Sequence, residues 1–304
     1  MIYTCTMNTA IDLYVALDHL VPNKVNRTRD EDYQPNGKGV NVSIMLKKLG
    51  IENTALGFIG GFSGKYIDDS LRDLQITTEF IEVDGITRIN VFVNAEEEYK
   101  IVNQGPTIKA EEVQHLLQKV QGIKSGDTLV VSGSLPKGVP ESVITDIASI
   151  CAEQQVKLVL DTSVDSVLDT LSYQPFLLKP NDEEIAKWFQ KDHPLTEEEL
   201  LIYGQELLIK GAQNVIISRG EKGALYLTEN MQLKANAPKG EVVNTACSGD
   251  AMLATFIARQ NQSSSMEEAL AYAVATGAST AFSKGLSDLE DVSNLREQID
   301  ITTL

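Results

Sequence analysis

Residues 243–254 read Val-Asn-Thr-Ala-Cys-Ser-Gly-Asp-Ala-Met-Leu-Ala, and our interpretation of the chain starts from this stretch. Small polar residues with one glycine lead into an apolar segment of helical spacing, which predicts a loop that opens a helix with Asp250 in its first turn. Backbone N–H groups at a helix N-terminus attract negative charge, and a carboxylate beside them could take a proton from a hydroxyl group. Aspartate is also favoured in a first turn for structural reasons. Taken alone, the stretch therefore favours ordinary capping over catalysis.

Composition and charge restrict the classes of protein that fit this chain. Its 304 residues, 42% of them hydrophobic, suit one large α/β domain. The 43 acidic residues outnumber the 26 basic ones, and the net charge of -17 argues against general binding to nucleic acids or anionic membranes. The three cysteines lie far apart, so we expect neither a disulfide framework nor a zinc site. We see no signal peptide and no apolar run near the ~18 residues of a membrane span, and we expect a cytoplasmic protein.

The hydrophobic periodicity predicts strands that alternate with helices. We expect strands at 2–7, 54–60, 128–132, 157–161, 176–179 and 214–218, and helices at about 40–49, 65–74, 110–121, 140–154, 164–171, 181–190 and 196–210. Such alternation is typical of a mostly parallel sheet with helices on both faces, in which ligands bind outside the carboxyl ends of the strands. The predicted fold class is therefore α/β, with residues 1–304 forming a single domain.

Three short predicted strands interrupt the alternation. Residues 80–83, 88–94 and 99–102 follow one another with turn signals between them and no helix. They predict a small antiparallel sheet, joined by segments near Val15 and Arg27. This second sheet would be built from residues near 13–33 and 80–103.

Two stretches contain residue types suited to phosphate, sugar or metal ions. In Asn36-Gly37-Lys38-Gly39-Val40-Asn41, the glycines allow close backbone approach and Lys38 and Asn41 offer donors, although the spacing fits neither a Walker A loop nor a dinucleotide fingerprint. In the stretch 179–184, Asn181 and Glu184 share one helix face, where their oxygens could hold Mg²⁺ through waters. A plain turn explains the first stretch equally well, and a capping box explains the second.

Three further stretches have weaker signals. Residues 218–224 could wrap the phosphates of a nucleotide, but a hairpin turn is the simpler interpretation. Arg88 and Asn90 share one face of a strand, where arginine suits phosphate recognition or is merely exposed. Residues 132–136 are either a turn or an edge that contacts a sugar. The remaining residues of interest receive no functional prediction, and we expect surface or core positions for them: His19, His115, His193 and Trp188.

Taken together and in this order, these motifs resemble those of the PfkB (ribokinase-like) carbohydrate kinases over nearly the whole chain. The matching stretches are 8–12, 37–41, 57–60, 132–136, 179–184 and 248–250. Within the family the chain resembles the branch of 1-phosphofructokinase and tagatose-6-phosphate kinase, and Thr87-Arg88-Ile89-Asn90 favours the former. The resemblance implies a ribokinase-like fold with a small β-sheet lid over the sugar. Because such lids often pair, it also implies a homodimer.

The resemblance also implies a role for each matching residue. Asp250 would deprotonate the sugar hydroxyl, and the backbone N–H groups of Cys247, Ser248, Gly249 and Asp250 would form an anion hole. The residues implied for the sugar phosphate are Asp12, Gly37, Lys38, Asn41, Arg88 and Asn90. Those implied for ATP are Lys179, Ser218, Gly220, Lys222 and Gly223, and those implied for Mg²⁺ are Asn181 and Glu184. The implied reaction transfers the γ-phosphoryl group of ATP to fructose 1-phosphate, which gives fructose 1,6-bisphosphate, and its catalysis depends on positioning and electrostatics.

Three positions depart from the family pattern. Thr9 stands where proline is usual, and Asn36 replaces the first glycine of a pair, although asparagine tolerates positive φ. Cys247 stands at the first glycine of the anion-hole loop. If that position needs positive φ, the cysteine is strained by roughly 1–3 kcal/mol, which would affect the rate more than the type of reaction.

Three alternatives remain open from the sequence. The same chemistry could act on tagatose 6-phosphate, or the chain could be a catalytically weak relative that binds sugar phosphates, since Cys247 departs from the pattern. A dinucleotide-dependent oxidoreductase is the default for a doubly wound sheet, but no G-x-G-x-x-G follows the first strand.

Overall fold

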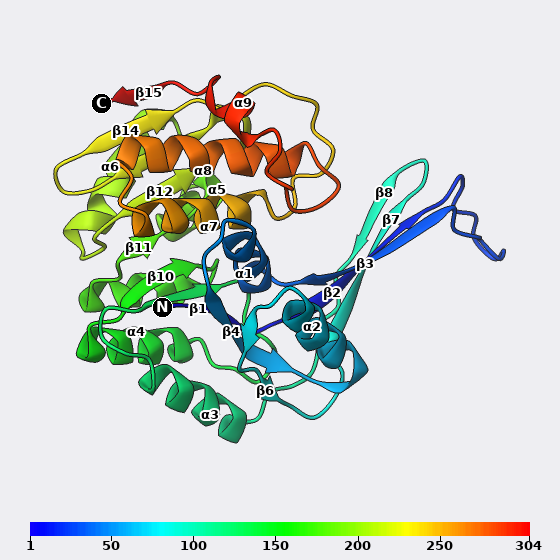
Figure 1. The fold of residues 1–304 in the computed structure, drawn as a ribbon. Helices are drawn as coiled ribbons and strands as arrows, with labels where there is room; N and C mark the ends of the chain where they lie inside the picture. The colour runs from blue at the N-terminus through cyan, green and yellow to red at the C-terminus, as the bar shows by residue number, and fades with distance from the viewer.

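A large sheet forms the centre of the computed structural model, which describes residues 1–304 (Figure 1). Its strands are β1 (Ile2–Thr6), β4 (Asn53–Ile59), β5 (Thr77–Thr78), β6 (Ile81–Glu82), β9 (Thr128–Ser132), β10 (Lys157–Asp161), β11 (Leu177–Leu178), β12 (Val215–Ser218), β13 (Ala224–Leu227), β14 (Gln232–Ala235) and β15 (Ile301–Thr303). They are ordered β15-β14-β13-β12-β11-β10-β9-β1-β4-β5, with β6 beside β4. The pairs from β5 to β12 are parallel and those from β12 to β15 antiparallel. The predicted, mostly parallel sheet is confirmed.

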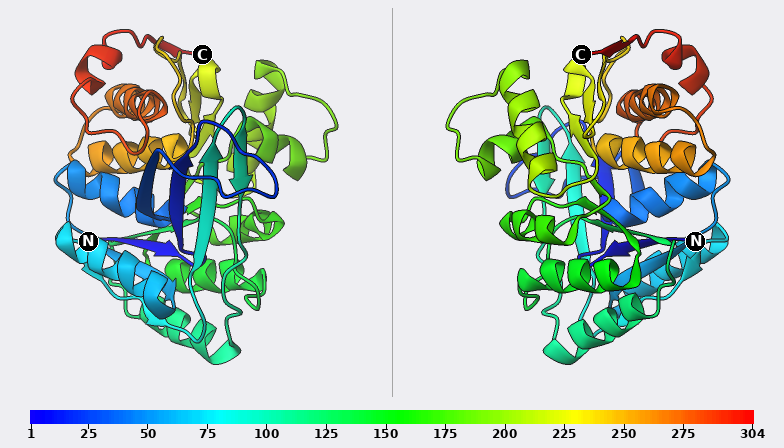
Figure 2. Two further views of the ribbon diagram at one scale, coloured as in Figure 1. Left: turned by 90° about the vertical axis from the view of Figure 1, so that its right-hand side faces the viewer. Right: turned by 90° about the vertical axis from the view of Figure 1, so that its left-hand side faces the viewer.

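Helices cover both faces of this sheet (Figure 2). They are α1 (Lys38–Lys48), α2 (Gly61–Asp73), α3 (Ala110–Gln121), α4 (Ser142–Gln154), α5 (Asp182–Trp188), α6 (Glu197–Ile209), α7 (Ser248–Asn261), α8 (Met266–Ala281) and α9 (Val292–Arg296), with short 3₁₀ helices at Asp165–Tyr173 and Gly220–Lys222. The apolar faces of α3, α4, α5 and α6 pack in one core cluster, and those of α1, α7 and α8 pack in another on the opposite side of the sheet. The helices predicted at 110–121, 140–154 and 196–210 are confirmed to within two residues.

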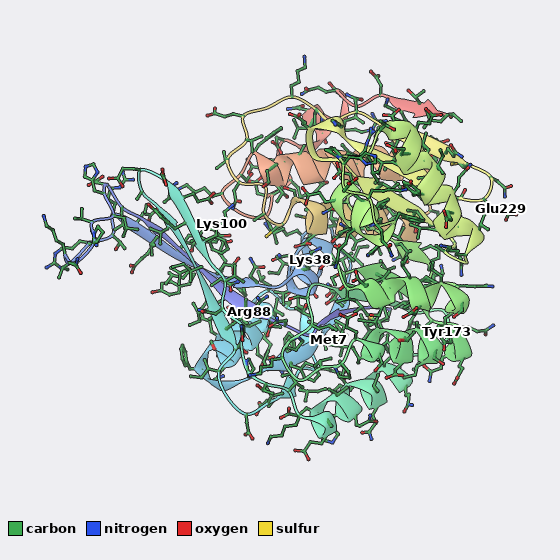
Figure 3. The ribbon with its side chains drawn as sticks, turned by 180° about the vertical axis from the view of Figure 1, so that it is seen from behind. Met7, Lys38, Arg88, Lys100, Tyr173 and Glu229 are labelled. Carbon is green, nitrogen blue, oxygen red and sulfur yellow. The ribbon has the colours of Figure 1, made fainter.

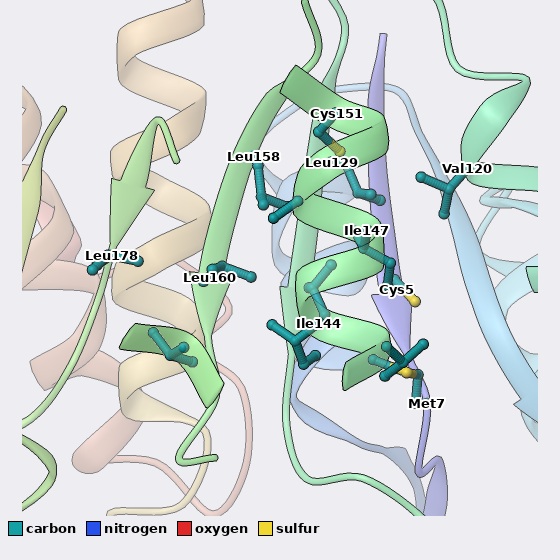
Figure 4. Packing of buried hydrophobic residues seen from close by; sticks show 14 of the residues in the cluster. Cys5, Met7, Val120, Leu129, Ile144, Ile147, Cys151, Leu158, Leu160 and Leu178 are labelled. Carbon is teal, nitrogen blue, oxygen red and sulfur yellow. The ribbon is translucent and has the colours of Figure 1, made fainter. Parts of the chain in front are cut away.

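Apolar side chains of α3 and α4 pack against the large sheet in one core cluster (Figure 4). Cys5 of β1 and Cys151 of α4 are buried there as free thiols. Trp188 is buried as expected, and the three histidines are exposed. None of the helices combines the length and the apolar character that crossing a membrane requires.

A second, four-stranded sheet projects from the body of the molecule (Figure 1). Its strands are β2 (Ala10–Ala16), β3 (Asp30–Asn36), β7 (Arg88–Asn94) and β8 (Glu98–Ile101), in the order β3-β2-β7-β8. The prediction of a purely antiparallel sheet was wrong, because β2 and β7 pair in parallel. The predicted strand at 80–83 is also corrected. It appears as β6 and pairs with β4, since Ile81 and Val83 are buried in the large apolar core.

The first glycines of α1 bring the start of this helix against β1. Gly37 has a φ of 122°, and a Cβ atom there would lie 2.6 Å from Thr6 Cγ2. A Cβ atom on Gly39 would lie 2.4 Å from Thr6 Oγ1, so neither position has room for a side chain. The stretch 36–41 is not a plain turn throughout, because Asn36 is the last residue of the edge strand β3 and α1 begins at Lys38; Asn36 does not have positive φ.

Candidate active site

A cavity of about 920 Å³ lies at the carboxyl ends of the parallel strands, between α1 and the loop that opens α7. One end is lined by side chains that come from the small sheet and α1, namely Asp12, Asn36, Lys38 and Asn41. The other end is lined by the hairpin after β12, the segment 237–242 and the inner side of α8. Segments far apart in the sequence therefore share one site, at the edge where α/β sheets bind ligands.

The loop that opens α7 supplies unpaired backbone donors at the middle of this cavity. Cys247 is the N-cap residue of α7 and has a φ of 63°. A residue other than glycine is strained at positive φ, so the strain expected for Cys247 is present. The backbone N–H groups of Gly249 and Asp250 make no hydrogen bond within the protein, as expected for the first turn of a helix. Partial positive charge therefore gathers at this point of the cavity.

The carboxylate of Asp250 lies in the cavity but is only 5% exposed. Asn41 Nδ2 of α1 donates a hydrogen bond to Asp250 Oδ2 at 2.8 Å, because α1 and α7 pack against each other on one face of the sheet. Burial and the neighbouring carboxylate of Asp161 raise the pKa of Asp250 from 3.8 to about 6, against the opposing effect of Lys38. A pKa near the working pH is what a general base requires.

Asp161, which the sequence analysis did not single out, joins two lysines beneath the loop. Asp161 Oδ1 lies 3.0 Å from the Nζ atom of Lys38 and 3.2 Å from that of Lys179, and its side chain is fully buried. Burial disfavours the ionised form of Asp161. The charges of Lys179 and Lys38 outweigh this effect and lower the pKa of the Asp161 carboxyl. Sequence reasoning could have used one signal: the predicted buried strand ends in an aspartate, within Leu-Asp-Thr at 160–162. Ligands bind at that end of a parallel strand.

Lys179, for which the resemblance implied a contact with ATP, lines the cavity. Its side chain is only 5% exposed, and its Nζ atom lies 3.3 Å from where a Cβ atom on Gly249 would stand. The ammonium group therefore lies directly beside the loop that opens α7. Lys38 lies in the middle of the molecule, at the base of the small sheet (Figure 3). The charge of Asp161 raises the pKa of Lys38, which stays cationic.

Asp12 of β2 is held in the cavity by two asparagine amides. Asn90 Nδ2 donates to Asp12 Oδ1 at 2.8 Å, and Asn36 Nδ2 donates to Asp12 Oδ2 at 2.6 Å. Burial raises the pKa of Asp12, although the hydrogen bond from Asn90 and the charge of Arg88 oppose this. Asn90 thus contacts Asp12 and does not itself line the cavity.

Arg88 also lies outside the cavity lining, at the base of the small sheet (Figure 3). Its guanidinium group donates to the backbone carbonyl groups of Asn8 at 3.0 Å and Asn103 at 3.3 Å, while its Nε atom is buried without a partner. The exposed arginine considered above as the alternative is not observed. Gly37 also lies outside the cavity lining, and it shapes the turn before α1 through its positive φ.

Asn181 and Glu184 form the capping box that the sequence allowed. Glu184 N donates to Asn181 Oδ1 at 2.7 Å, and Asn181 N donates to Glu184 Oε2 at 2.9 Å. Both residues also line the cavity, where Glu184 Oε1 stays outside the capping box. The chain has no cluster of three acidic or histidine side chains that could cage a metal ion.

The nucleotide-sized end of the cavity is built mostly from backbone and small residues. Residues 218–223 form the tight connection of the antiparallel strands β12 and β13, with Gly220 and Gly223 at positive φ, so the hairpin interpretation is correct. Ser218, Gly220, Lys222 and Gly223 all line the cavity as well. The sequence analysis missed the opposite wall of this end, which includes Pro238, Lys239, Gly240, Gly277, Ala278 and Phe282. Lys239 is charged, but no motif marks that wall in the sequence.

This arrangement suits transfer of a phosphoryl group to an alcohol. A buried carboxylate of raised pKa lies beside unpaired backbone donors and two ammonium groups, in a cavity with a polar end and an end of small and apolar residues. The donors stabilise negative charge on the transferred group, and the carboxylate can accept the proton of the attacking hydroxyl.

Comparisons with known proteins agree with this geometry. The sequence profile of the pfkB family carbohydrate kinases matches residues 4–292. A D-tagatose-1-phosphate kinase of Bacillus licheniformis is 54% identical, and a 1-phosphofructokinase of Bacillus subtilis is 38% identical, each over the whole length of both chains. The crystal structure of phosphofructokinase-2 from Escherichia coli in complex with substrates and products has a TM-score of 0.90 at 26% identity, covering 97% of this chain and 98% of that one. The predicted family and ribokinase-like fold are confirmed: this chain belongs to the pfkB family of carbohydrate kinases and is an ATP-dependent sugar-phosphate kinase.

Proposed function

We propose that this kinase transfers the γ-phosphoryl group of ATP to the free primary hydroxyl group of a ketohexose 1-phosphate, giving a 1,6-bisphosphate. The observation that carries the proposal is the buried carboxylate of Asp250, which lies at the start of α7 and shares one cavity with the polar side chains of β2 and α1 and with the hairpin after β12. A hydroxyl group placed there has a base on one side and the anion-attracting loop on the other.

In this proposal Asp250 removes the proton of the sugar hydroxyl as its oxygen attacks the γ-phosphorus. The bond between that phosphorus and the bridging oxygen of ADP breaks, and the backbone N–H groups of Gly249 and Asp250 stabilise the charge on the transferred group. Lys38 and Lys179, fixed by Asp161, add positive charge on the same side. Asp12 accepts hydrogen bonds from the sugar hydroxyl groups.

Asn181 and Glu184 fit a magnesium ion that is held mainly by water and by the phosphates of ATP. Their oxygens line the cavity beside the hairpin, and Glu184 Oε1 is outside the capping box. Mg²⁺ keeps several waters and binds through one or two carboxylates, so the carboxylate of Glu184 with the amide oxygen of Asn181 would suffice. Such an ion would neutralise charge on the phosphates.

Two ketohexose 1-phosphates are the candidate sugars. Fructose 1-phosphate, the choice made from the sequence, and tagatose 1-phosphate differ only in the configuration at C4. We place tagatose 1-phosphate first, because the 54% identical relative carries that substrate in its name. Tagatose 6-phosphate, the alternative considered from the sequence, has its phosphate at the other end of the molecule.

A coupled assay of ADP release over four sugars tests this proposal. The panel is tagatose 1-phosphate, fructose 1-phosphate, tagatose 6-phosphate and fructose 6-phosphate, each at varied concentration with saturating ATP. We expect the two 1-phosphates to give kcat/KM values at least about tenfold above those of the 6-phosphates. A higher kcat/KM for either 6-phosphate would overturn the choice of substrate class, and no ADP with any sugar would support the catalytically weak alternative.

We further propose that the small sheet covers the sugar end and pairs with that of a second copy. Several apolar side chains on this sheet and its loops are exposed, namely Val25, Tyr33, Tyr99, Ile101 and Val102. Burying them in a symmetric dimer would remove this apolar surface from water. A molar mass of one chain by light scattering at micromolar concentration would contradict the dimer.

A further inference from the structure

The side-chain amide of Asn41 has more hydrogen-bond acceptors around it than it has hydrogens. Asn41 Nδ2 lies 2.8 Å from Asp250 Oδ2, 3.0 Å from Asn36 Oδ1 and 3.2 Å from Cys247 Sγ. An amide NH₂ group has two hydrogens, so only two of these three acceptors can be satisfied at one time. Because Asn41 is only 3% exposed, water does not readily take the place of a missing partner.

Asn36 extends this contact toward the sugar end of the cavity. While its Oδ1 atom accepts from Asn41, its Nδ2 atom donates to Asp12 Oδ2 at 2.6 Å. Two amides therefore connect the carboxylate of Asp12 in β2 with the carboxylate of Asp250 in α7. The other oxygen of Asp12 is held separately by Asn90. Asn36 is also 3.9 Å from Cys247 Sγ, so the two side chains meet beside Asn41.

We propose that Asn36 and Cys247 are positioning residues that jointly hold the amide of Asn41, and through it the carboxylate of Asp250, and that Asn36 in addition orients Asp12 toward the sugar. The proposal rests on the proposed function, in which Asp250 is the base and Asp12 a sugar ligand. In this proposal neither side chain touches the reacting atoms: both act through Asn41, and Asn36 acts also through Asp12.

The two hydrogens of the Asn41 side-chain amide determine how substitutions of Asn36 and Cys247 combine. If either Asn36 or Cys247 loses its acceptor, Asn41 still donates one hydrogen to Asp250 and the other to the acceptor that remains. If both acceptors are lost, the second hydrogen has no partner in a buried place, and the amide is free to turn away from Asp250. The effects of the two substitutions on kcat should therefore exceed the product of the single effects.

A double-mutant cycle in the full-length enzyme, with tagatose 1-phosphate and fructose 1-phosphate as probes, tests the coupling. We expect Asn36→Ala and Cys247→Gly each to lower kcat about threefold, and the double variant to lower it about fiftyfold, well beyond the product of about tenfold. Asn36→Ala should also raise KM for the sugar about tenfold with KM for ATP unchanged, because it releases one oxygen of Asp12. Glycine is compatible with the φ of 63° at position 247, so the variant should fold.

Two further variants separate the side chain from the backbone. Cys247→Ser keeps an acceptor at position 247, so Asn36→Ala combined with Cys247→Ser should restore kcat to within about threefold of Asn36→Ala alone. Asn230→Ala, in the exposed turn between β13 and β14, is the matched control and should change none of these constants.

The outcomes distinguish this inference from the proposed function. Single effects that simply multiply in the double variant, or an unchanged sugar KM in Asn36→Ala, would overturn the inference while the wild-type enzyme remains a ketohexose 1-phosphate kinase. A wild-type enzyme that turns over neither 1-phosphate would instead contradict the proposed function. Thermal melting of each variant shows whether a loss of kcat reflects unfolding.

Discussion

The two ends of the cavity are built by different means. At the sugar end, the walls are charged and amide side chains that hold one another through hydrogen bonds, such as Asp12, Asn36 and Asn41. At the end proposed for the nucleotide, the walls are mostly a hairpin and small or apolar residues such as Ala278 and Phe282, with a few charged side chains, namely Glu221, Lys222 and Lys239. Asp250 and the start of α7 lie where the two ends meet.

This difference shows how one site combines selectivity with general binding of a nucleotide. A wall of hydrogen-bonded side chains rejects a sugar whose hydroxyl groups leave those polar atoms unpaired, and this rejection is strong. A wall of backbone and apolar groups recognises mainly shape. We therefore expect substitutions at the sugar end to separate substrates, and substitutions at the nucleotide end to change KM for ATP alone.

The largest effect is expected where the two ends meet. Asp250→Asn removes the base but keeps the shape of the side chain, so kcat should fall by about 10²–10⁴ with both KM values nearly unchanged. Since the pKa of Asp250 is raised by burial, the charged form costs stability at neutral pH, and the amide variant should melt at a temperature no lower than that of the wild type. Unchanged turnover would remove Asp250 as the base.

Asp161→Asn should have the opposite effect on stability. It leaves Lys179 buried and Lys38 partly buried without their counter-charge, and breaking such a buried pair costs about 3 kcal/mol. The pKa of Asp161 is lowered in the fold, so its contribution is present above pH 3.8 and is lost as pH falls through the native pKa. Chemical denaturation at neutral pH measures the loss, and a stability equal to that of the wild type would refute the role of Asp161.

Arg88→Ala tests the edge of the sugar end. Arg88 binds backbone carbonyl groups and lies near Asp12, so its removal should loosen the sugar end and raise KM for the sugar phosphate about tenfold, with kcat changed less. An unchanged sugar KM would exclude Arg88 from the sugar end, whether as a phosphate contact or as a support of Asp12.

Ala278→Leu should give the smallest effect and tests the nucleotide end. The added side chain enters the cavity from α8 and takes space from the nucleotide, so KM for ATP should rise about fivefold while KM for the sugar stays as it is. A change confined to the sugar KM would reverse the assignment of the two ends. Initial rates over a grid of both substrates separate these results.

The sequence predicted local elements better than it predicted contacts between distant segments. The alternation of apolar segments predicted the parallel strands β1, β4, β9, β10, β11 and β12 and the helices between them, because their periods are local properties, but it did not predict β13, β14 and β15. It did not predict that β2 and β7 pair in parallel, since both strands are partly exposed and pairing depends on contacts distant in the sequence.

The site shows a similar limit. The residues around Asp250, Lys38 and Asn41 were found because they lie in motifs, and the structure brings them to one cavity. Asp161 was missed because a single aspartate at the end of a strand has no motif of its own. The apolar wall with Pro238 and Phe282 was missed because such residues occur throughout the core.

The pH dependence of kcat tests the central claim most directly, which is that a buried carboxylate accepts the proton of the sugar hydroxyl. A base must be ionised, and the pKa of Asp250 is raised to about 6, so kcat should be constant near neutral pH and fall tenfold per pH unit below about pH 6. We propose to measure it from about pH 4.5 to about pH 8 with the enzyme shown to stay folded throughout. A kcat that stays constant down to pH 4.5 would contradict the account.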